Sequence, residues 1–337
     1  MIIYNPKIRA GLLEFGIQIP IHDSRTTQTF EALKSHPQIG PNLHRWHCDR
    51  IDVRLTRRDL LRAHSKAYVD DLYSHQLEKI IISTYELIDS EGNYYRYDPD
   101  TATLPLSDLF QRTLHKASGT AQCAQRALSN GFCYYFSGGM HHAHPGHGSG
   151  FCLINDIVIA ARKMQAEKGI KKVWIIDTDA HKGDGTAAAT AGDDTIITLS
   201  IHMAKGWPLD GPEVHPDGKA NPAYTPSDID IPVQSGDEPA YLEKLQQGLM
   251  RLATKGPADL AIVVSGADPW ELDELPSTSS LRLTKEQLMD RDRMVYNFLK
   301  DHQVPAAFLM AGGYGDKVWQ VFARFLTWVL PKEGGDR

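Results

Sequence analysis

The segment Val173-Trp-Ile-Ile-Asp177-Thr-Asp179-Ala-His181-Lys-Gly-Asp184-Gly185 decides the fold and the chemistry expected of this chain. Its first four residues are apolar, which predicts a strand buried on both faces of a parallel sheet. Three acids and a histidine follow directly, and they have no packing purpose. Residues 177, 179 and 181 alternate, so their side chains share one face while the chain stays extended. Asp179 and His181 are therefore well placed to bind one ion.

Short apolar runs of this kind alternate with long helical patterns along the whole chain. Strands are expected at Ile2–Tyr4, Cys133–Ser137, Val173–Asp177, Thr195–Ser200, Leu260–Ser265 and Ala306–Met310. Helices are expected around Leu109–Leu128, Leu153–Glu167, Ala240–Ala253, Lys285–Asp301 and Lys317–Leu330. The alternation predicts a doubly wound α/β fold. Because no linker or repeat interrupts it, we expect one domain over residues 1–337.

The composition narrows the class of protein. The 36 basic and 42 acidic residues give a formal net charge of −6, which argues against direct binding of nucleic acid. No apolar run approaches the roughly 20 residues needed to cross a bilayer, and no leader precedes the first strand, so we expect a cytoplasmic protein. The four cysteines form no Cys-x-x-Cys pair and predict neither disulfides nor a thiolate zinc site.

Other strand ends carry further polar groups, and sites gather beyond the carboxyl ends of strands in such sheets. The strand that starts at Leu260 ends in Gly266-Ala-Asp268 and adds a second carboxylate. Two carboxylates and one imidazole leave a coordination position open, which indicates a catalytic zinc-class site.

Two more strand ends supply candidates for proton transfer. Gly138-Gly-Met is followed by His141 and His142, whose adjacent side chains diverge and so predict two separate roles. Asp177 and Asp184 are free to tune one imidazole each. Tyr314 follows the glycine pair 312–313, and its hydroxyl is a candidate donor to a developing oxyanion.

These motifs, in this order, resemble the zinc-dependent histone deacetylase family, which includes the acetylpolyamine amidohydrolases. Almost the whole chain takes part, because the stretches 60–72, 97–98, 149–156 and 199–202 also look like family segments. The resemblance implies an arginase-like, three-layer α/β/α fold around a mostly parallel sheet of about eight strands. It implies hydrolysis of the amide of an acylated amine, either acyl-lysine in a peptide or protein or an acetylated polyamine.

The resemblance also implies a role for individual residues. The metal ligands would be Asp179, His181 and Asp268, and the ion Zn²⁺, with Fe²⁺ as an alternative. His141 would pair with Asp177 and His142 with Asp184, with the choice of general base left open, and Tyr314 would polarise the carbonyl. Substrate contacts would come from Gly150, Phe151 and Trp207, and a structural K⁺ would bind at Asp177, Asp179, His181 and Ser200.

A few positions depart from the family pattern. Lys182 stands where many members have a second histidine, and the loop at 203–211 lacks the usual ending, which affects the assignment of Trp207. Arg25 is only a loose match to an arginine of an internal product channel. The rim acid that grips the substrate backbone has no single candidate within residues 89–100.

Two rival functions are consistent with parts of the sequence. Asp179-Ala-His181 resembles the motif of binuclear manganese ureohydrolases, but these need an aspartate where this chain has Gly183. A catalytically inactive homologue that binds acyl-lysine is the alternative of another class. Such a protein should have lost a ligand, a histidine or the tyrosine, and none is missing here.

Overall fold

The centre of the molecule is one sheet of eight parallel strands. The computed structural model describes residues 1–7 and 11–333, so residues 8–10 and 334–337 of the expected domain lie outside the described part. The strand order is β2-β1-β3-β8-β7-β4-β5-β6. The strands are β1 (Ile2–Ile3), β2 (His47–Cys48), β3 (Phe132–Tyr135), β4 (Val173–Asp177), β5 (Ile196–Met203), β6 (Ile229–Val233), β7 (Leu260–Ser265) and β8 (Ala306–Met310).

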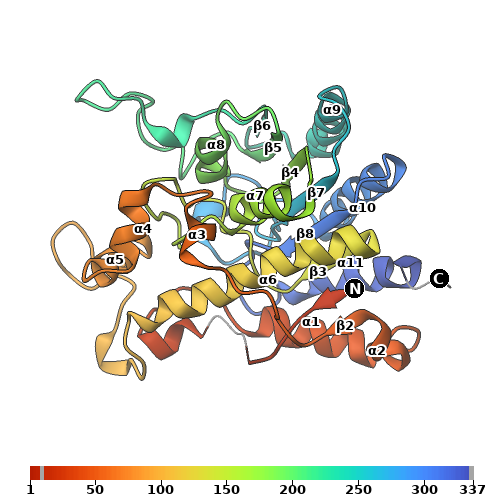
Figure 1. Ribbon diagram of the computed structural model, residues 1–337, viewed down its shortest axis with the longest axis horizontal. Helices are drawn as coiled ribbons and strands as arrows, with labels where there is room; N and C mark the ends of the chain where they lie inside the picture. The colour runs from red at the N-terminus through yellow and green to blue at the C-terminus, as the bar shows by residue number, and fades with distance from the viewer. Residues whose placement is uncertain (8–10, 334–337) are drawn as a thin grey trace.

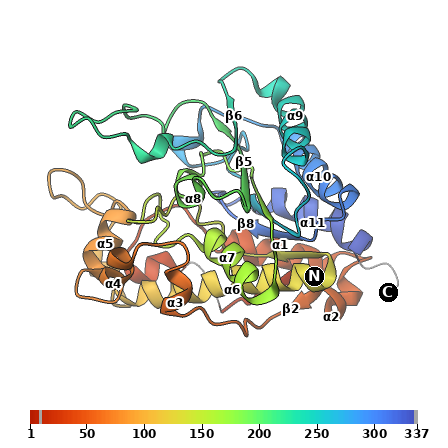
Figure 2. The same cartoon turned by 45° about the horizontal axis from the view of Figure 1, so that its top comes forward.

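Helices cover both faces of this sheet (Figures 1 and 2). Successive strand residues face opposite layers: Val173 and Ile175 belong to one hydrophobic core, and Trp174 and Ile176 to the other. The first core includes helices α6 (Asp108–Asn130) and α7 (Asp156–Lys168), and the second includes α1 (Ser24–Ser35), α9 (Tyr241–Ala253), α10 (Lys285–Asp301) and α11 (Trp319–Glu333). Burial on both faces confirms the three-layer, arginase-like α/β/α fold.

Shorter helices surround these layers. They are α2 (Leu43–Trp46), α3 (Arg57–Leu60), α4 (Lys66–Leu72), α5 (Leu77–Thr84) and α8 (Asp184–Thr190). Among the residues that the structure describes, no helix has both the length and the apolar character needed to span a bilayer.

The observed elements differ from the expected ones at a few places. The edge strands β2 and β6 were not expected from the sequence. β6 alternates buried and more exposed residues and contains Pro232, which an edge strand tolerates. Helix α7 begins at Asp156 instead of Leu153, because the Asn155 side chain accepts the Val158 N–H and caps the helix there.

Two long loops extend from the side of the molecule opposite the two termini (Figure 1). Residues 204–228 form one, with an isolated bridge between Val214 and Ala220. Residues 88–103 form the other, with a bridge between Ile88 and Tyr94. Both segments are rich in glycine, proline and polar residues.

Candidate active site

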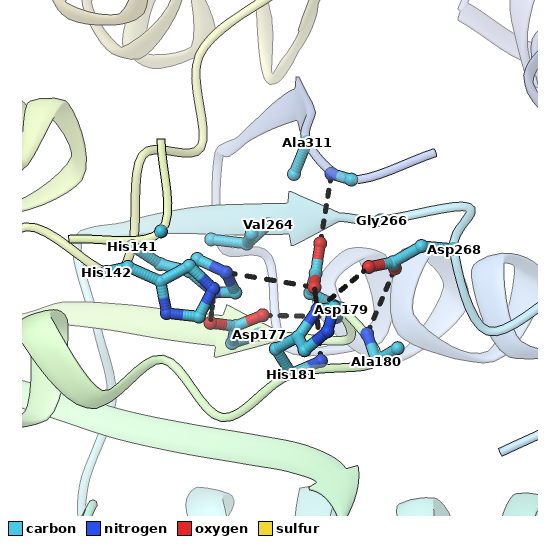
Figure 3. Close-up of polar contacts among 12 residues, drawn as sticks. His141, His142, Asp177, Asp179, Ala180, His181, Val264, Gly266, Asp268 and Ala311 are labelled. Atoms are coloured by element: carbon cyan, nitrogen blue, oxygen red, sulfur yellow. Dashed lines mark hydrogen bonds and ion pairs between the residues drawn. The ribbon is translucent and has the colours of Figure 1, made fainter. Parts of the chain in front are cut away.

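Three buried side chains that can ligate a metal converge where β4 and β7 end. The turn after β4 carries Asp179 and His181, and the turn after β7 carries Asp268 (Figure 3). One potential ligand atom from each lies within 4.8 Å of the others, and within the described residues no other such group of three occurs. The structure thus brings the three expected ligands together.

The reason for this convergence differs from the one expected. The chain bends after Asp177 instead of staying extended. Backbone N–H groups hold the bend, because Asp177 Oδ1 accepts the N–H of Asp179 at 3.1 Å and Asp179 Oδ1 accepts that of His181 at 3.2 Å. Simple alternation of side chains along a strand is therefore not what aligns the ligands.

Two glycines leave room for the carboxylates. A Cβ on Gly312 would lie 2.4 Å from Asp179 Oδ2, and one on Gly266 would lie at the same distance from that oxygen. The N–H of Gly312 donates to Asp179 Oδ2 at 2.9 Å instead. A side chain at either position would displace the carboxylate that the fold places here.

The charge balance of the cluster fits a cation. Asp268 is fully buried, and its Oδ2 has no hydrogen-bond partner in the described part of the chain. That oxygen lies 3.2 Å from His181 Nδ1 without hydrogen-bond geometry. Burial and the charge of Asp179 raise the pKa of Asp268 to about 6. One divalent ion would neutralise the two carboxylates and would be bound by the Asp268 oxygen that lacks a hydrogen-bond partner. The donor set therefore fits such an ion.

Two histidine–aspartate pairs flank the cluster. His141 Nδ1 lies 2.6 Å from Asp177 Oδ2, and His142 Nδ1 lies 2.7 Å from Asp184 Oδ1. An ionised carboxylate only accepts, so each imidazole carries its proton on Nδ1 and directs Nε2 elsewhere. The structure thus forms both of the expected pairs.

The two imidazoles differ in their electrostatic surroundings. Burial opposes the charge of His141, but Asp177 and Asp179 outweigh burial and raise the pKa of His141 to about 10. Burial and the neighbouring His141 lower the pKa of His142 to about 4. The neutral form is therefore favoured at His142 and the charged form at His141.

Tyr314 lines the same cavity as the histidines. Its backbone N–H donates to Asp273 Oδ2 at 2.7 Å, which fixes the turn that follows β8. Burial and the charge of Asp268 raise the pKa of Tyr314, so the hydroxyl keeps its proton and remains a donor.

The mouth of the cavity is lined by Gly150, Phe151 and Trp207, all three expected substrate contacts. The Trp207 ring centroid lies 4.5 Å from that of His142, and a Cβ on Gly150 would lie 2.3 Å from the Trp207 ring. Glu86 also lines the mouth, beside its ion-pair partner Arg96. The rim of the cavity thus has an acidic side chain outside residues 89–100, the range in which the acid that grips the substrate backbone was expected.

Two of the residues expected to hold K⁺ lie on neighbouring strands, Asp177 at the end of β4 and Ser200 within β5. Asp177 is in register with Ser200 on the neighbouring strand. Lys182 points away from the metal ligands, with Nζ 3.4 Å from Asp230 Oδ2 on β6. The lysine that replaces a common family histidine therefore leaves the Asp179–His181–Asp268 cluster intact.

Several residues that hold the site were not identified from the sequence. Arg291, fully buried on α10, donates to the carbonyl oxygens of Thr178 at 3.0 Å and Gly266 at 2.7 Å, joining the two ligand turns. Asp156 accepts the N–H groups of Gly139 and Met140, which precede the histidine pair. The available signal was a charged residue on the apolar face of each helix.

The cavity continues inward from the metal ligands to Arg25. The Arg25 guanidinium donates to the carbonyl oxygens of Met310 at 2.8 Å, Ala311 at 2.7 Å and Gly313 at 3.1 Å. Arg25 therefore lies against the end of β8 and lines this cavity.

Comparison with known proteins assigns the family. The model of the histone deacetylase domain matches residues 19–330. An uncharacterized protein of Picosynechococcus is 34% identical over 215 residues, which are 64% of this chain and 66% of that protein. Acetoin utilization protein AcuC of Staphylococcus aureus is 31% identical over 320 residues, 92% of this chain and 76% of AcuC.

A plant protein extends the comparison. Histone deacetylase 2 of Arabidopsis thaliana is 26% identical over 262 residues, 74% of this chain and 64% of that protein. This chain therefore spans about two thirds to three quarters of the length of these three relatives. Proteins of this family are typically metal-dependent. The deacetylase relatives support the assignment of this chain as a hydrolase that acts on amides. The chain belongs to the histone deacetylase family.

Proposed function

We propose that this protein is a metal-dependent deacylase that hydrolyses the amide of acylated lysine in peptides or proteins. The observation that carries the proposal is the buried Asp179–His181–Asp268 cluster, in which one carboxylate oxygen has no hydrogen-bond partner. Beside it lies the imidazole of His142, whose Nε2 carries no proton. A site that binds an amide without hydrolysing it has no need of either feature.

The cluster would hold one zinc-class ion, Zn²⁺ or Fe²⁺. When bound, the ion supplies Lewis acidity that polarises the scissile carbonyl and lowers the pKa of a water. The donor set supports a single ion, because Gly183 stands where a binuclear ureohydrolase would need another aspartate.

The chain's own side chains would move the protons. His142 Nε2 accepts the proton of the attacking water, since Asp184 holds the His142 proton on Nδ1. His141, whose charged form Asp177 stabilises, protonates the departing amine. The Tyr314 hydroxyl donates to the oxyanion of the tetrahedral intermediate. The products are a carboxylate and a free amine.

The mouth would select the substrate. The carbonyl of Gly150 accepts the amide N–H, and the rings of Phe151 and Trp207 flank the aliphatic stem of the acylated amine. Arg25, at the inner end of the cavity, would attract the carboxylate product. An acetylated polyamine has the same stem and amide, and it remains the alternative substrate.

A structural K⁺ would bind at Asp177, Asp179, His181 and Ser200. Residues 1–337 would form a single cytoplasmic domain.

Turnover of a substrate panel tests the proposal. The purified protein, loaded with one equivalent of Zn²⁺, is assayed on acetyl-lysine and longer acyl-lysine peptides and on acetylated polyamines. We expect chelator-sensitive release of carboxylate, fastest from an acyl-lysine peptide. Faster release from the polyamines would replace the substrate class. Binding of acyl-lysine peptide by the metal-loaded protein without any turnover would favour the non-catalytic homologue.

A further inference from the structure

One carboxylate in the active site is shared by two histidines. Asp184 Oδ1 accepts from His142 Nδ1 at 2.7 Å, and Asp184 Oδ2 lies 2.8 Å from His144 Nε2. His144 is buried, with 3% of its surface exposed. Neither the sequence motifs nor the proposed chemistry gives His144 a role.

The hydrogen-bond directions follow from the carboxylate. Burial raises the pKa of Asp184, but the hydrogen bonds from His142 and His144 outweigh burial and hold that pKa well below its usual range. An ionised carboxylate has only acceptors, so His144 must donate its Nε2 proton to Oδ2. With both oxygens engaged, the carboxylate cannot rotate without losing a hydrogen bond.

His144 is itself held in place from three directions. The N–H of Asn155 donates to His64 Nε2 at 2.9 Å, so His64 Nδ1 bears the proton and donates to the His144 carbonyl oxygen at 2.9 Å. The His144 N–H donates to the His147 carbonyl oxygen at 2.9 Å. The His144 and His147 rings are stacked, with centroids 4.5 Å apart and planes 8° apart. Because these contacts restrict His144, its ring can in turn restrict the orientation of the Asp184 carboxylate.

We propose that His144 is a positioning residue for the reaction: its imidazole N–H locks Asp184, and Asp184 in turn holds His142 with the proton on Nδ1. The inference rests on the proposed role of His142 as the base. Without the second donor, Asp184 can rotate, and His142 can shift its proton to Nε2, where it no longer accepts a proton from water. A merely structural buried pair would contribute to stability and not to this tautomer.

Two variants with side chains of similar size distinguish a positioning role of His144 from a purely structural one. His144→Gln keeps an N–H donor, whereas His144→Leu removes it. We expect kcat on an acyl-lysine peptide to fall about 10–100-fold in the leucine variant, with KM and metal content nearly unchanged, and most of kcat to return in the glutamine variant. The exposed His215→Leu is the control, because it makes the same change of side chain away from Asp184, and we expect it to retain kcat. Unchanged kcat in the leucine variant, or equal losses in both, would overturn the proposal.

A spectroscopic readout keeps this test independent of turnover. In protein labelled with ¹⁵N-histidine, the His142 Nδ1–H signal is assigned by its absence in His142→Gln. We expect that signal in the wild type and in His144→Gln, and its loss in His144→Leu. A signal that persists in His144→Leu would overturn the positioning role. A wild type that shows the signal but hydrolyses no acylated amine would instead count against the proposed function alone.

Discussion

The floor and the mouth of the pocket are built in different ways. At the floor, Asp179 and Asp268 directly follow strands of the central sheet, and backbone N–H groups hold both carboxylates. At the mouth, Phe151 and Trp207 lie on connecting segments, and Trp207 belongs to the long loop 204–228. The central sheet therefore fixes the position of the candidate ligands, whereas the proposed substrate contacts lie on segments that can vary without disturbing the sheet.

The largest effect is expected from removing a ligand at the floor. Asp179→Ala or Asp268→Ala should abolish both metal retention and activity, because the remaining donors cannot hold an ion in working geometry. Metal analysis of the purified variants, with the exposed Asp71→Ala as control, checks this. Full occupancy by one ion per chain in either variant would remove that residue from the ligand set.

A smaller effect is expected beside the ligands. His142→Ala should keep the metal and lose turnover by about 10²–10⁴-fold, the usual contribution of a general base. Steady-state kinetics and metal content are measured on the same preparation. A metal-free variant would mean that His142 is a ligand, and the division between ligands and proton carriers would have to be redrawn.

The turn after β8 should contribute less again. Tyr314→Phe is expected to lower kcat by about 10²–10³-fold, the loss of one oxyanion donor, with metal content and KM nearly unchanged. Tyr94→Phe, a change of the same size on the surface, should have no effect. Near-wild-type turnover of Tyr314→Phe would show that the tyrosine only packs, and would reopen the case for the non-catalytic homologue.

The smallest effect is expected at the mouth, and it tests whether mouth and floor are separable. Trp207→Ala should raise KM about tenfold, which corresponds to about 1.4 kcal/mol of lost contact with the aliphatic stem. Metal content should stay at the wild-type level, and kcat should change little. If the variant lost its metal, Trp207 would be part of the floor, and the contrast between the two regions would fail.

The same contrast explains what could be predicted from the sequence. The ligands Asp179, His181 and Asp268 were identified because each follows an apolar strand within four residues. Arg291 was missed because it reaches Thr178 and Gly266 through space from a distant helix. A charged residue on the apolar face of α10 indicates that a buried partner exists, but which groups it contacts depends on how α10 packs. The place of Glu86 at the mouth likewise depends on the packing of a loop.

Edge strands show the limit of periodicity. β2 has two residues, too few for any pattern, and β6 alternates buried and more exposed residues where the six expected strands are buried throughout. Residues buried on both faces identify central strands, so the six strands with that signature were all expected. The two edges became evident only from the pairing of the sheet.

Metal titration of the apoprotein shows whether one ion at the Asp179–His181–Asp268 cluster is needed for turnover. The protein is stripped with a chelator, and turnover of an acetyl-lysine peptide is followed as Zn²⁺ is added back. Three convergent ligands at a single cluster predict that activity is absent without metal and reaches its plateau at one equivalent per chain. Full activity of the stripped protein, or a plateau that requires two equivalents, would contradict the account.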